Sequence, residues 1–167
     1  MNNKWHKHFG VYGICYKNKK LLVVVKNGGP YDSLYDLPGG SFKENEGLSQ
    51  CLKREYLEET NSQVEITENM GCYDFLLNAA YNGCNYTHHI AQFYMVNIIA
   101  SNEAPLKRIL KNSKQNEEND SMGYKWIDIE SINTNNSSPL VIKAIELLFN
   151  KTRNYEMEDL RKIFGVK

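Results

Sequence analysis

Residues 37–60 carry the most specific pattern in this chain, LPGGSFKENEGLSQCLKREYLEET. Its second half predicts a helix over Leu48–Thr60, which follows a turn built from Pro38 and two glycines. Gly47 is an acceptable N-cap, and Asn61 follows the last helical turn, where asparagine tolerates a left-handed conformation best after glycine. The segment therefore predicts a glycine turn that leads directly into a helix.

The acidic side chains of this helix gather on one edge. Helical side chains advance by about 100° per residue, so Glu58 lies about 60° to one side of Glu55 and Glu59 about 40° to the other. An adjacent apolar arc, suited to burial against a sheet, contains Leu48, Cys51, Leu52 and Tyr56. Such crowded carboxylates repel one another unless a cation is present, and carboxylate oxygens are natural ligands of a hard divalent cation. Arg54 can neutralise and orient one of them.

A run such as REYLEE is usually only a solvated helix face with charge pairs. The preceding glycine turn and the position of Glu46 favour a site instead. The whole pattern resembles the Nudix box. The residues that carry the resemblance are Gly40, Glu46, Arg54, Glu55, Tyr56, Glu58 and Glu59. Asn61 stands where the family pattern has glycine and Ser62 where it has an apolar residue, and both changes lie at the end of the motif.

The resemblance implies an α/β fold in which a mixed β-sheet is sandwiched between α-helices, an α/β/α sandwich. It implies a Mg²⁺-dependent hydrolase, with Mn²⁺ as an alternative ion, that cleaves the pyrophosphate bond of a nucleoside di- or triphosphate derivative to give a nucleoside monophosphate. Glu58 and Glu59 would be the main metal ligands, Glu55 a ligand or the base, and the Gly40 carbonyl a further ligand. Arg54 would orient a glutamate, completing the catalytic set.

Other residues are candidates for proton transfer and substrate binding. The general base is left open between the box glutamates and a later loop that carries Glu117, Glu118 and Asp120. Lys26 ends a predicted strand near the expected cleft, and Tyr35 and Phe42 are aromatic candidates for substrate contact. The proline that the family's ADP-ribose hydrolases have beyond the box is absent, because Leu77 stands there. The tyrosine of the diadenosine polyphosphate hydrolases is unclear, although Tyr81 lies close.

Different functional classes compete with this interpretation. A non-catalytic Nudix module could bind a nucleotide and regulate a partner, although a pure binder has no need of the full carboxylate set. Isomerase chemistry on a prenyl diphosphate also occurs on this fold, but its additional cysteine and glutamate cannot be placed. A calcium site on a structural helix is the remaining alternative.

Composition narrows the class of partner. The chain has 167 residues, is 41% hydrophobic and 24% charged, and carries a formal net charge of zero. These values fit one soluble domain that acts on a small nucleotide and argue against a nucleic-acid polymer as partner. No stretch reads as a signal peptide or membrane span. Four cysteines without metal-ligand spacing predict buried free thiols and a cytoplasmic location. A homodimer is an open alternative by analogy with relatives.

The remaining pattern predicts strands on both sides of the box helix. The expected elements are a hairpin of Phe9–Tyr16 and Leu21–Lys26, strands at Val64–Cys72, Tyr73–Leu77, His88–Ala100 and Tyr124–Ile127, and a second helix at Pro139–Phe149. Residues 101–122 form a polar connection typical of a lid, a binding loop or disorder. We expect a hydrolase domain over residues 1–150 and, over 151–167, an extension that forms a short helix packed on the domain.

Overall fold

Two β-sheets and two α-helices form the described part of the chain. The computed structural model describes residues 4–81, 83–101, 121–150 and 153–162. Its elements are β1 (Trp5–Ile14), β2 (Tyr16–Lys17), β3 (Lys20–Lys26), η1 (Gly29–Tyr31), β4 (Tyr35–Asp36), β5 (Gly39–Gly40), α1 (Leu48–Thr60), β6 (Ser62–Leu77), β7 (Tyr86–Ser101), β8 (Ser121–Asp128), η3 (Ile129–Ser131), α3 (Pro139–Phe149) and β9 (Glu158–Asp159). Both helices have the bounds predicted from the sequence.

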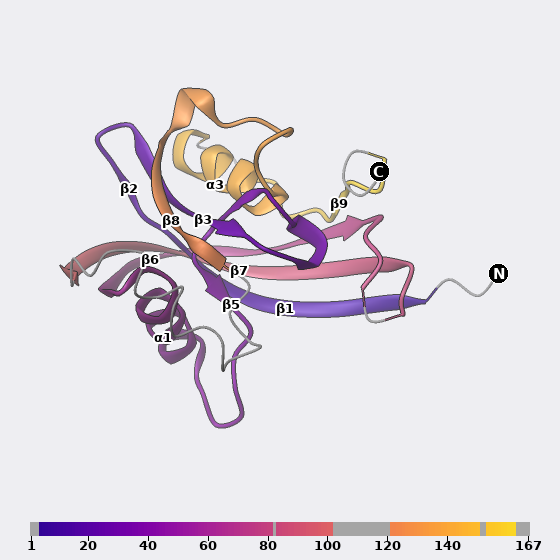
Figure 1. The fold of residues 1–167 in the computed structure, drawn as a ribbon, viewed down its shortest axis with the longest axis horizontal. Helices are drawn as coiled ribbons and strands as arrows, with labels where there is room; N and C mark the ends of the chain where they lie inside the picture. Colours follow the sequence, from indigo (N-terminus) through magenta and orange to yellow (C-terminus); the bar gives the residue numbers. More distant parts are fainter. Residues whose placement is uncertain (1–3, 82, 102–120, 151–152, 163–167) are drawn as a thin grey trace.

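The larger sheet has five strands in the order β5-β1-β7-β6-β9. β1 pairs with β7 in parallel from Trp5 opposite Tyr86 to Ile14 opposite Met95, whereas β6 and β7 are antiparallel. The sheet is therefore mixed. α1 and α3 lie on opposite sides of its long strands (Figure 1), which confirms the predicted α/β fold.

The smaller sheet is built around β3, which pairs with β2, β4 and β8. The turn between β2 and β3 has Asn18 and Lys19 at φ 52° and 61°, the left-handed pair that matches a tight hairpin to the twist of its strands. The predicted hairpin is present, but the strand expected over Phe9–Tyr16 is divided. β1 starts at Trp5 and ends at Ile14 in one sheet, while β2 belongs to the other.

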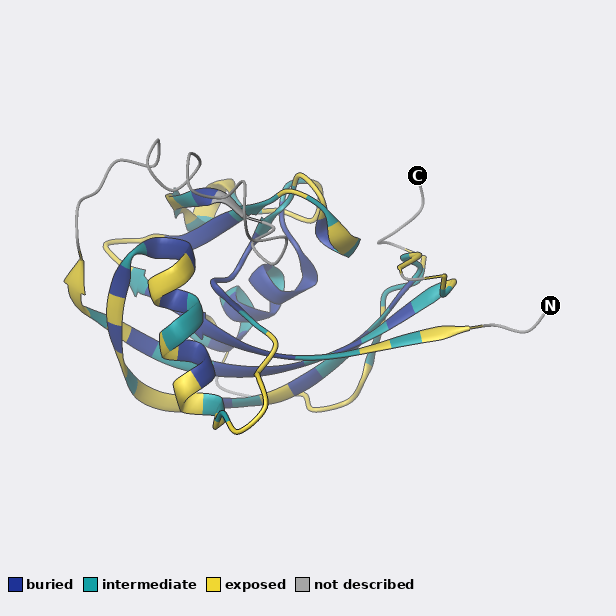
Figure 2. Ribbon diagram, turned by 60° about the horizontal axis from the view of Figure 1, so that its bottom comes forward, coloured by how far each residue is buried: buried dark blue, intermediate teal, exposed yellow. Residues whose placement is uncertain are grey.

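Each helix covers its own hydrophobic core. The core under α1 contains Val11, Cys15, Leu22, Cys51, Leu52, Tyr56, Val64 and Val96. The core on the α3 side contains Tyr12, Ile14, Leu21, Val23, Phe93, Leu140, Val141 and Ala144, among others. Successive residues of β1 and β3 enter different cores, so both faces of these strands are buried, as the dark blue sheet centre in Figure 2 shows. This explains the continuous apolar run Leu21–Val25.

Other strands differ from expectation in their extent. Val64–Cys72 and Tyr73–Leu77 form one strand, β6, in which bulges shift the register against β7. The bulges interrupt the alternation of buried residues, which is why the sequence suggested a break. β7 and β8 are longer at both ends than predicted.

The C-terminal extension contains the short strand β9 in its described part, residues 153–162, where a helix was expected. β9 pairs in parallel with β6 at Phe75 and Leu76. The polar connection predicted over residues 101–122, a lid, a binding loop or a disordered segment, lies at 102–120 outside the described residues. None of the described helices combines the length and apolar character needed to cross a membrane.

The cysteines only partly match their prediction. Cys15 and Cys51 are buried free thiols, as expected. Cys72 is exposed and Cys84 is half-buried. Cys72 lies on β6 just after its bulged stretch, so its outward orientation could not be read from simple alternation.

Gly39 is the residue that lets β5 approach β1. It pairs with Tyr12, while Gly40 pairs with Val11. The φ angle of Gly39 is 148°, and a Cβ added there would lie 2.1 Å from the Val11 carbonyl oxygen. Only glycine fits this combination of backbone angle and contact.

We predict that Gly39→Ala lowers the free energy of unfolding by about 3 kcal/mol or more, because it adds a backbone clash to an unfavourable φ. Gly28→Ala is the matched control, since its φ is 125° but nothing lies within 4 Å of the added Cβ. It should cost only about 1 kcal/mol. Urea unfolding of both variants makes the comparison, and equal losses would contradict this account of β5.

Candidate active site

α1 is fixed against the sheet by its ends and by one buried tyrosine. Gly47 is the N-cap, and its N–H donates to the Gln50 side chain at 2.8 Å. The helix ends at Asn61, which is left-handed at φ 52°, as predicted. Between them, the fully buried Tyr56 donates its hydroxyl to the Gly13 carbonyl on β1 at 2.9 Å. The acidic edge of the helix is thereby held beside the Gly39–Gly40 turn.

Arg54 joins the acidic residues into one cluster. Its guanidinium makes two bonds to Glu46, Nε to Oε1 at 2.7 Å and Nη2 to Oε2 at 2.8 Å. Nη1 donates to Glu55 Oε1 at 2.6 Å and to Glu58 Oε2 at 3.1 Å. Nη2 also reaches the Ser41 carbonyl at 3.1 Å. One side chain of α1 therefore orients three carboxylates and the loop before the helix.

The ionisation of the cluster follows from these contacts. The hydrogen bonds from Arg54 hold the pKa of Glu46 down, from 4.5 to about 2. Burial raises the pKa of Glu55, and the bond from Arg54 opposes that rise. Glu58 is 47% exposed, so water screens its charge. Burial therefore disfavours the charge on Glu55, and Arg54 counters that effect only in part.

Glu59 lies on the buried side of the helix, with 5% of its surface exposed. Its Oε2 accepts the N–H of Gly39 at 2.9 Å, and its Oε1 lies 3.9 Å from Lys26 Nζ. Gly40 packs closely as well, because a Cβ added there would lie 3.0 Å from the Glu55 carboxyl group. The Gly40 carbonyl accepts only a weak contact from Cys51 Sγ, at 3.6 Å.

The donor set fits a hard divalent cation. Arg54 uses one oxygen each of Glu55 and Glu58, while Glu55 Oε2 and Glu58 Oε1 are left for a ligand. With Glu59 and the Gly40 carbonyl, all these donors are oxygens, which Mg²⁺ prefers. Among the described residues, no three His, Cys, Asp or Glu side chains are already arranged around a metal position. The reason is visible in the contacts, since Arg54 draws Glu58 toward Glu46 and Gly39 holds Glu59.

The other predicted site residues are dispersed. Lys26 is the exception, because its ammonium group lies 3.9 Å from Glu59 Oε1 and so beside the acidic edge of α1. Tyr35 is half-buried against the core on the α3 side, and Phe42 is 49% exposed on the loop before α1, with its ring edge-on to Phe9 at 5.7 Å. Among the described residues, neither makes a hydrogen bond or ring contact with the carboxylates. Glu117, Glu118 and Asp120 lie outside the described residues.

A row of rings on β1 was not singled out from the sequence. The Tyr12 hydroxyl lies 2.9 Å from Nε2 of the buried His89 and 3.3 Å from Nε2 of His8. The Tyr31 hydroxyl lies 2.7 Å from His89 Nδ1, and burial lowers the pKa of His89. Tyr12 pairs with Gly39, and the N–H of Gly39 donates to Glu59, so the backbone at one end of the row is linked to the acidic edge of α1. The sequence feature that could have revealed this row is the alternation of side chains along β1, which places His8 and Tyr12, four residues apart, on the same face.

Comparisons with known proteins agree with this arrangement. The family model described as the NUDIX domain matches residues 4–148. A curated ADP-ribose pyrophosphatase of Methanocaldococcus jannaschii is 29% identical over 68 residues, which is 41% of this chain. The match spans only 40% of that relative's length.

Solved structures share the fold at low identity. A NUDIX hydrolase from Nitrosomonas europaea superposes with a TM-score of 0.67 at 18% identity, covering 90% of this chain and 93% of that one. A MutT NUDIX hydrolase from Burkholderia pseudomallei gives 0.64 at 15% identity, covering 86% and 98%. An ADP-ribose pyrophosphatase from Streptococcus suis gives 0.54 at 14% identity, covering 91% and 98%.

We predict that Glu46→Gln lowers the free energy of unfolding at pH 7 by about 1–2 kcal/mol, because it breaks a bidentate pair with Arg54. The pKa of Glu46 is about 2 in the folded chain and 4.5 ordinarily. Its contribution is therefore present above pH 4.5 and is lost as the pH falls toward 2. The difference between wild type and variant should shrink across that interval.

Denaturant unfolding at several pH values measures this effect. Glu44→Gln, an exposed position on the same loop, is the control and should change the unfolding free energy little. A Glu46→Gln difference that stayed constant down to pH 2 would contradict the assigned Arg54 pairing.

Proposed function

The chain belongs to the NUDIX domain family, and from this premise we propose that it is a divalent-metal-dependent pyrophosphohydrolase. Its substrate would be a nucleoside di- or triphosphate derivative, and one product a nucleoside monophosphate. The observation that carries the proposal is the Arg54 cluster, which holds Glu46, Glu55 and Glu58 beside the Gly39–Gly40 turn. A structural helix would not need a half-buried arginine that bridges three carboxylates.

Glu55, Glu58, Glu59 and the Gly40 carbonyl would hold Mg²⁺, or Mn²⁺ in its place. Bound there, the cation would neutralise charge on the phosphate oxygens and so admit a nucleophile. Arg54 keeps Glu55 and Glu58 near the turn, and these carboxylates would have to shift when the cation binds, because the described acidic side chains do not surround a metal position beforehand. The Gly39 N–H keeps Glu59 directed at the turn rather than at solvent.

The chain's own residues also provide proton transfer and charge. Glu55 would be either a metal ligand or the general base through Oε2, the oxygen that Arg54 does not use, and burial raises the pKa of this carboxyl group, as a general base requires. The alternative bases remain Glu117, Glu118 and Asp120. Lys26 places a positive charge 3.9 Å from Glu59, where it can attract a polyphosphate.

The organic group of the substrate would lie on the β1 face that carries His8 and Tyr12. Of the rings on this face, Tyr12 and His89 are buried, so the half-buried His8 is the ring onto which a nucleobase could stack. Tyr35 and Phe42 stay as further candidates for that contact. A nucleoside triphosphate is the first candidate substrate. ADP-ribose is the second compound to assay, because the curated relative is an ADP-ribose pyrophosphatase. Two buried free thiols, Cys15 and Cys51, suit a reducing compartment such as the cytoplasm.

We expect Glu58→Gln to reduce Mg²⁺-dependent hydrolysis by about 100-fold or more, since it removes a proposed metal ligand. Glu58 is exposed, so the fold should persist. Glu59→Gln should be as inactive but less stable, because Glu59 is buried. The assay incubates wild type and variants with Mg²⁺ and a panel of nucleotides and resolves the products by mass.

Glu65→Gln, an exposed acid on β6, is the matched control and should retain activity. Calorimetric titration of Mn²⁺ gives a readout independent of turnover, and Glu58→Gln should weaken that binding. Wild-type turnover in Glu58→Gln would refute the site. Tight nucleotide binding by wild type, without cleavage of any panel member, would instead identify a regulatory module.

A further inference from the structure

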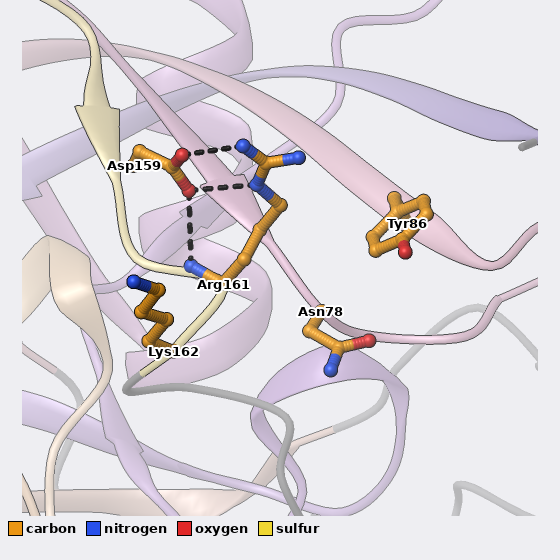
Figure 3. Close-up of a pocket in the computed structure, with 5 residues that line it drawn as sticks. All are labelled: Asn78, Tyr86, Asp159, Arg161 and Lys162. Atoms are coloured by element: carbon orange, nitrogen blue, oxygen red, sulfur yellow. Dashed lines mark hydrogen bonds and ion pairs between the residues drawn. The ribbon is translucent and has the colours of Figure 1, made fainter.

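A cavity of about 390 Å³ lies at the end of the larger sheet that is remote from the carboxylate cluster. Its lining residues are Asn78, Tyr86, Asp159, Arg161 and Lys162 (Figure 3). Asn78 follows β6 directly, Tyr86 begins β7, and the other three belong to the segment that starts with β9. Along β1, the residue opposite Tyr86 is six positions from the residue opposite Gly40. This separation is about 20 Å at about 3.3 Å per residue.

The C-terminal segment is held in place where it forms the cavity wall. The Leu160 N–H donates to the Leu76 carbonyl at 2.9 Å, next to the parallel pairing of β9 with β6. Glu158 on β9 pairs with the buried Lys143 of α3 at 2.5 Å. These contacts fix the backbone on the N-terminal side of Arg161 and Lys162 and so place both residues at this end of the sheet.

The charges in the cavity leave a net positive site. Asp159 accepts Arg161 Nε at 2.8 Å and Nη2 at 2.5 Å, which orients the guanidinium and neutralises it. In the described part of the chain, Lys162 has no ion pair of its own. Two cations and one carboxylate leave one net positive charge among the lining residues, and Asp159 interacts electrostatically with Lys162 as well as with Arg161.

Aromatic surface adjoins Arg161 at this cavity. Tyr86 stacks on Trp5 with ring centroids 4.9 Å apart, and the Arg161 guanidinium lies 6.0 Å from the centre of the Trp5 ring. The Asn78 amide, which carries both a donor and an acceptor, lies at the same cavity. The cavity thus combines a ring for stacking, an amide for a polar ring edge and a cation for an anionic group.

We propose that this cavity is a second ligand site, which binds a nucleoside monophosphate. The base would stack on Tyr86 with its edge at Asn78, and the phosphate would lie at Lys162. Its volume is within the range of small-molecule sites, about 300–1,000 Å³. None of its residues belongs to the carboxylate cluster, so binding needs no divalent metal and does not rest on the proposed function.

The test is calorimetric titration of AMP into the full chain in the presence of EDTA, which removes divalent metal from the other site. Binding should be measurable, and Lys162→Gln and Tyr86→Leu should each weaken it by about tenfold or more. Glu58→Gln, at the other site, and Lys19→Gln, in the exposed hairpin turn, should bind AMP like wild type. Inorganic phosphate should bind at least about tenfold more weakly than AMP, because it cannot stack.

Thermal unfolding of each variant checks the fold, and Lys162 is exposed, so its variant remains informative if Tyr86→Leu is unstable. Absence of AMP binding up to about 10 mM would overturn the proposal. So would full binding by Lys162→Gln, or equal affinity for AMP and inorganic phosphate. Binding that Glu58→Gln abolishes and Lys162→Gln retains would place AMP at the carboxylates and would also refute the second site.

Discussion

Repulsion between carboxylates is the constraint on which the site depends. Three glutamates converge on Arg54, which also donates to the Ser41 carbonyl and to the Cys51 sulfur. A single planar cation suits this task because its N–H groups point in fixed, divergent directions. Lysine could neutralise the same charge, but it could not hold carboxylates from a loop and from two helical turns at once. The loop before α1 is therefore ordered by the same group that orders the acids.

A second constraint links the helix to the sheet. Gly39 and Gly40 bring the backbone of β5 between β1 and α1, and the Gly39 N–H binds the buried Glu59. Tyr56 adds a hydrogen bond from the same helix to β1. These contacts connect the acidic edge of α1 to the paired strands β1 and β5, so the strand pair restrains the carboxylates. Proteins place reactive groups on such rigid elements because small displacements are costly for catalysis.

Local features were predictable from the sequence, and long-range ones were not. Periodicity and end signals located both helices, and the spacing of Glu55, Glu58 and Glu59 indicated which residues share the edge. The bulged course of β6 and the pairing of β9 depend on partners distant in sequence, so no local pattern could reveal them. The exact partners of Arg54 were also hidden, because any of several glutamates could satisfy it. The ring row at Tyr12 and His89 needed the parallel register of β1 with β7.

That register has a consequence for how the molecule is made. Trp5 lies opposite Tyr86, so β1 has a parallel neighbour that is synthesised about 80 residues later in the chain. Loop closure over such a distance is slow compared with hairpin formation between β2 and β3. Until β7 is synthesised, the edge of β1 that pairs with it lacks its backbone hydrogen-bond partners. Lys4 and Lys7 are residues of the type that discourages aggregation at such an exposed strand edge.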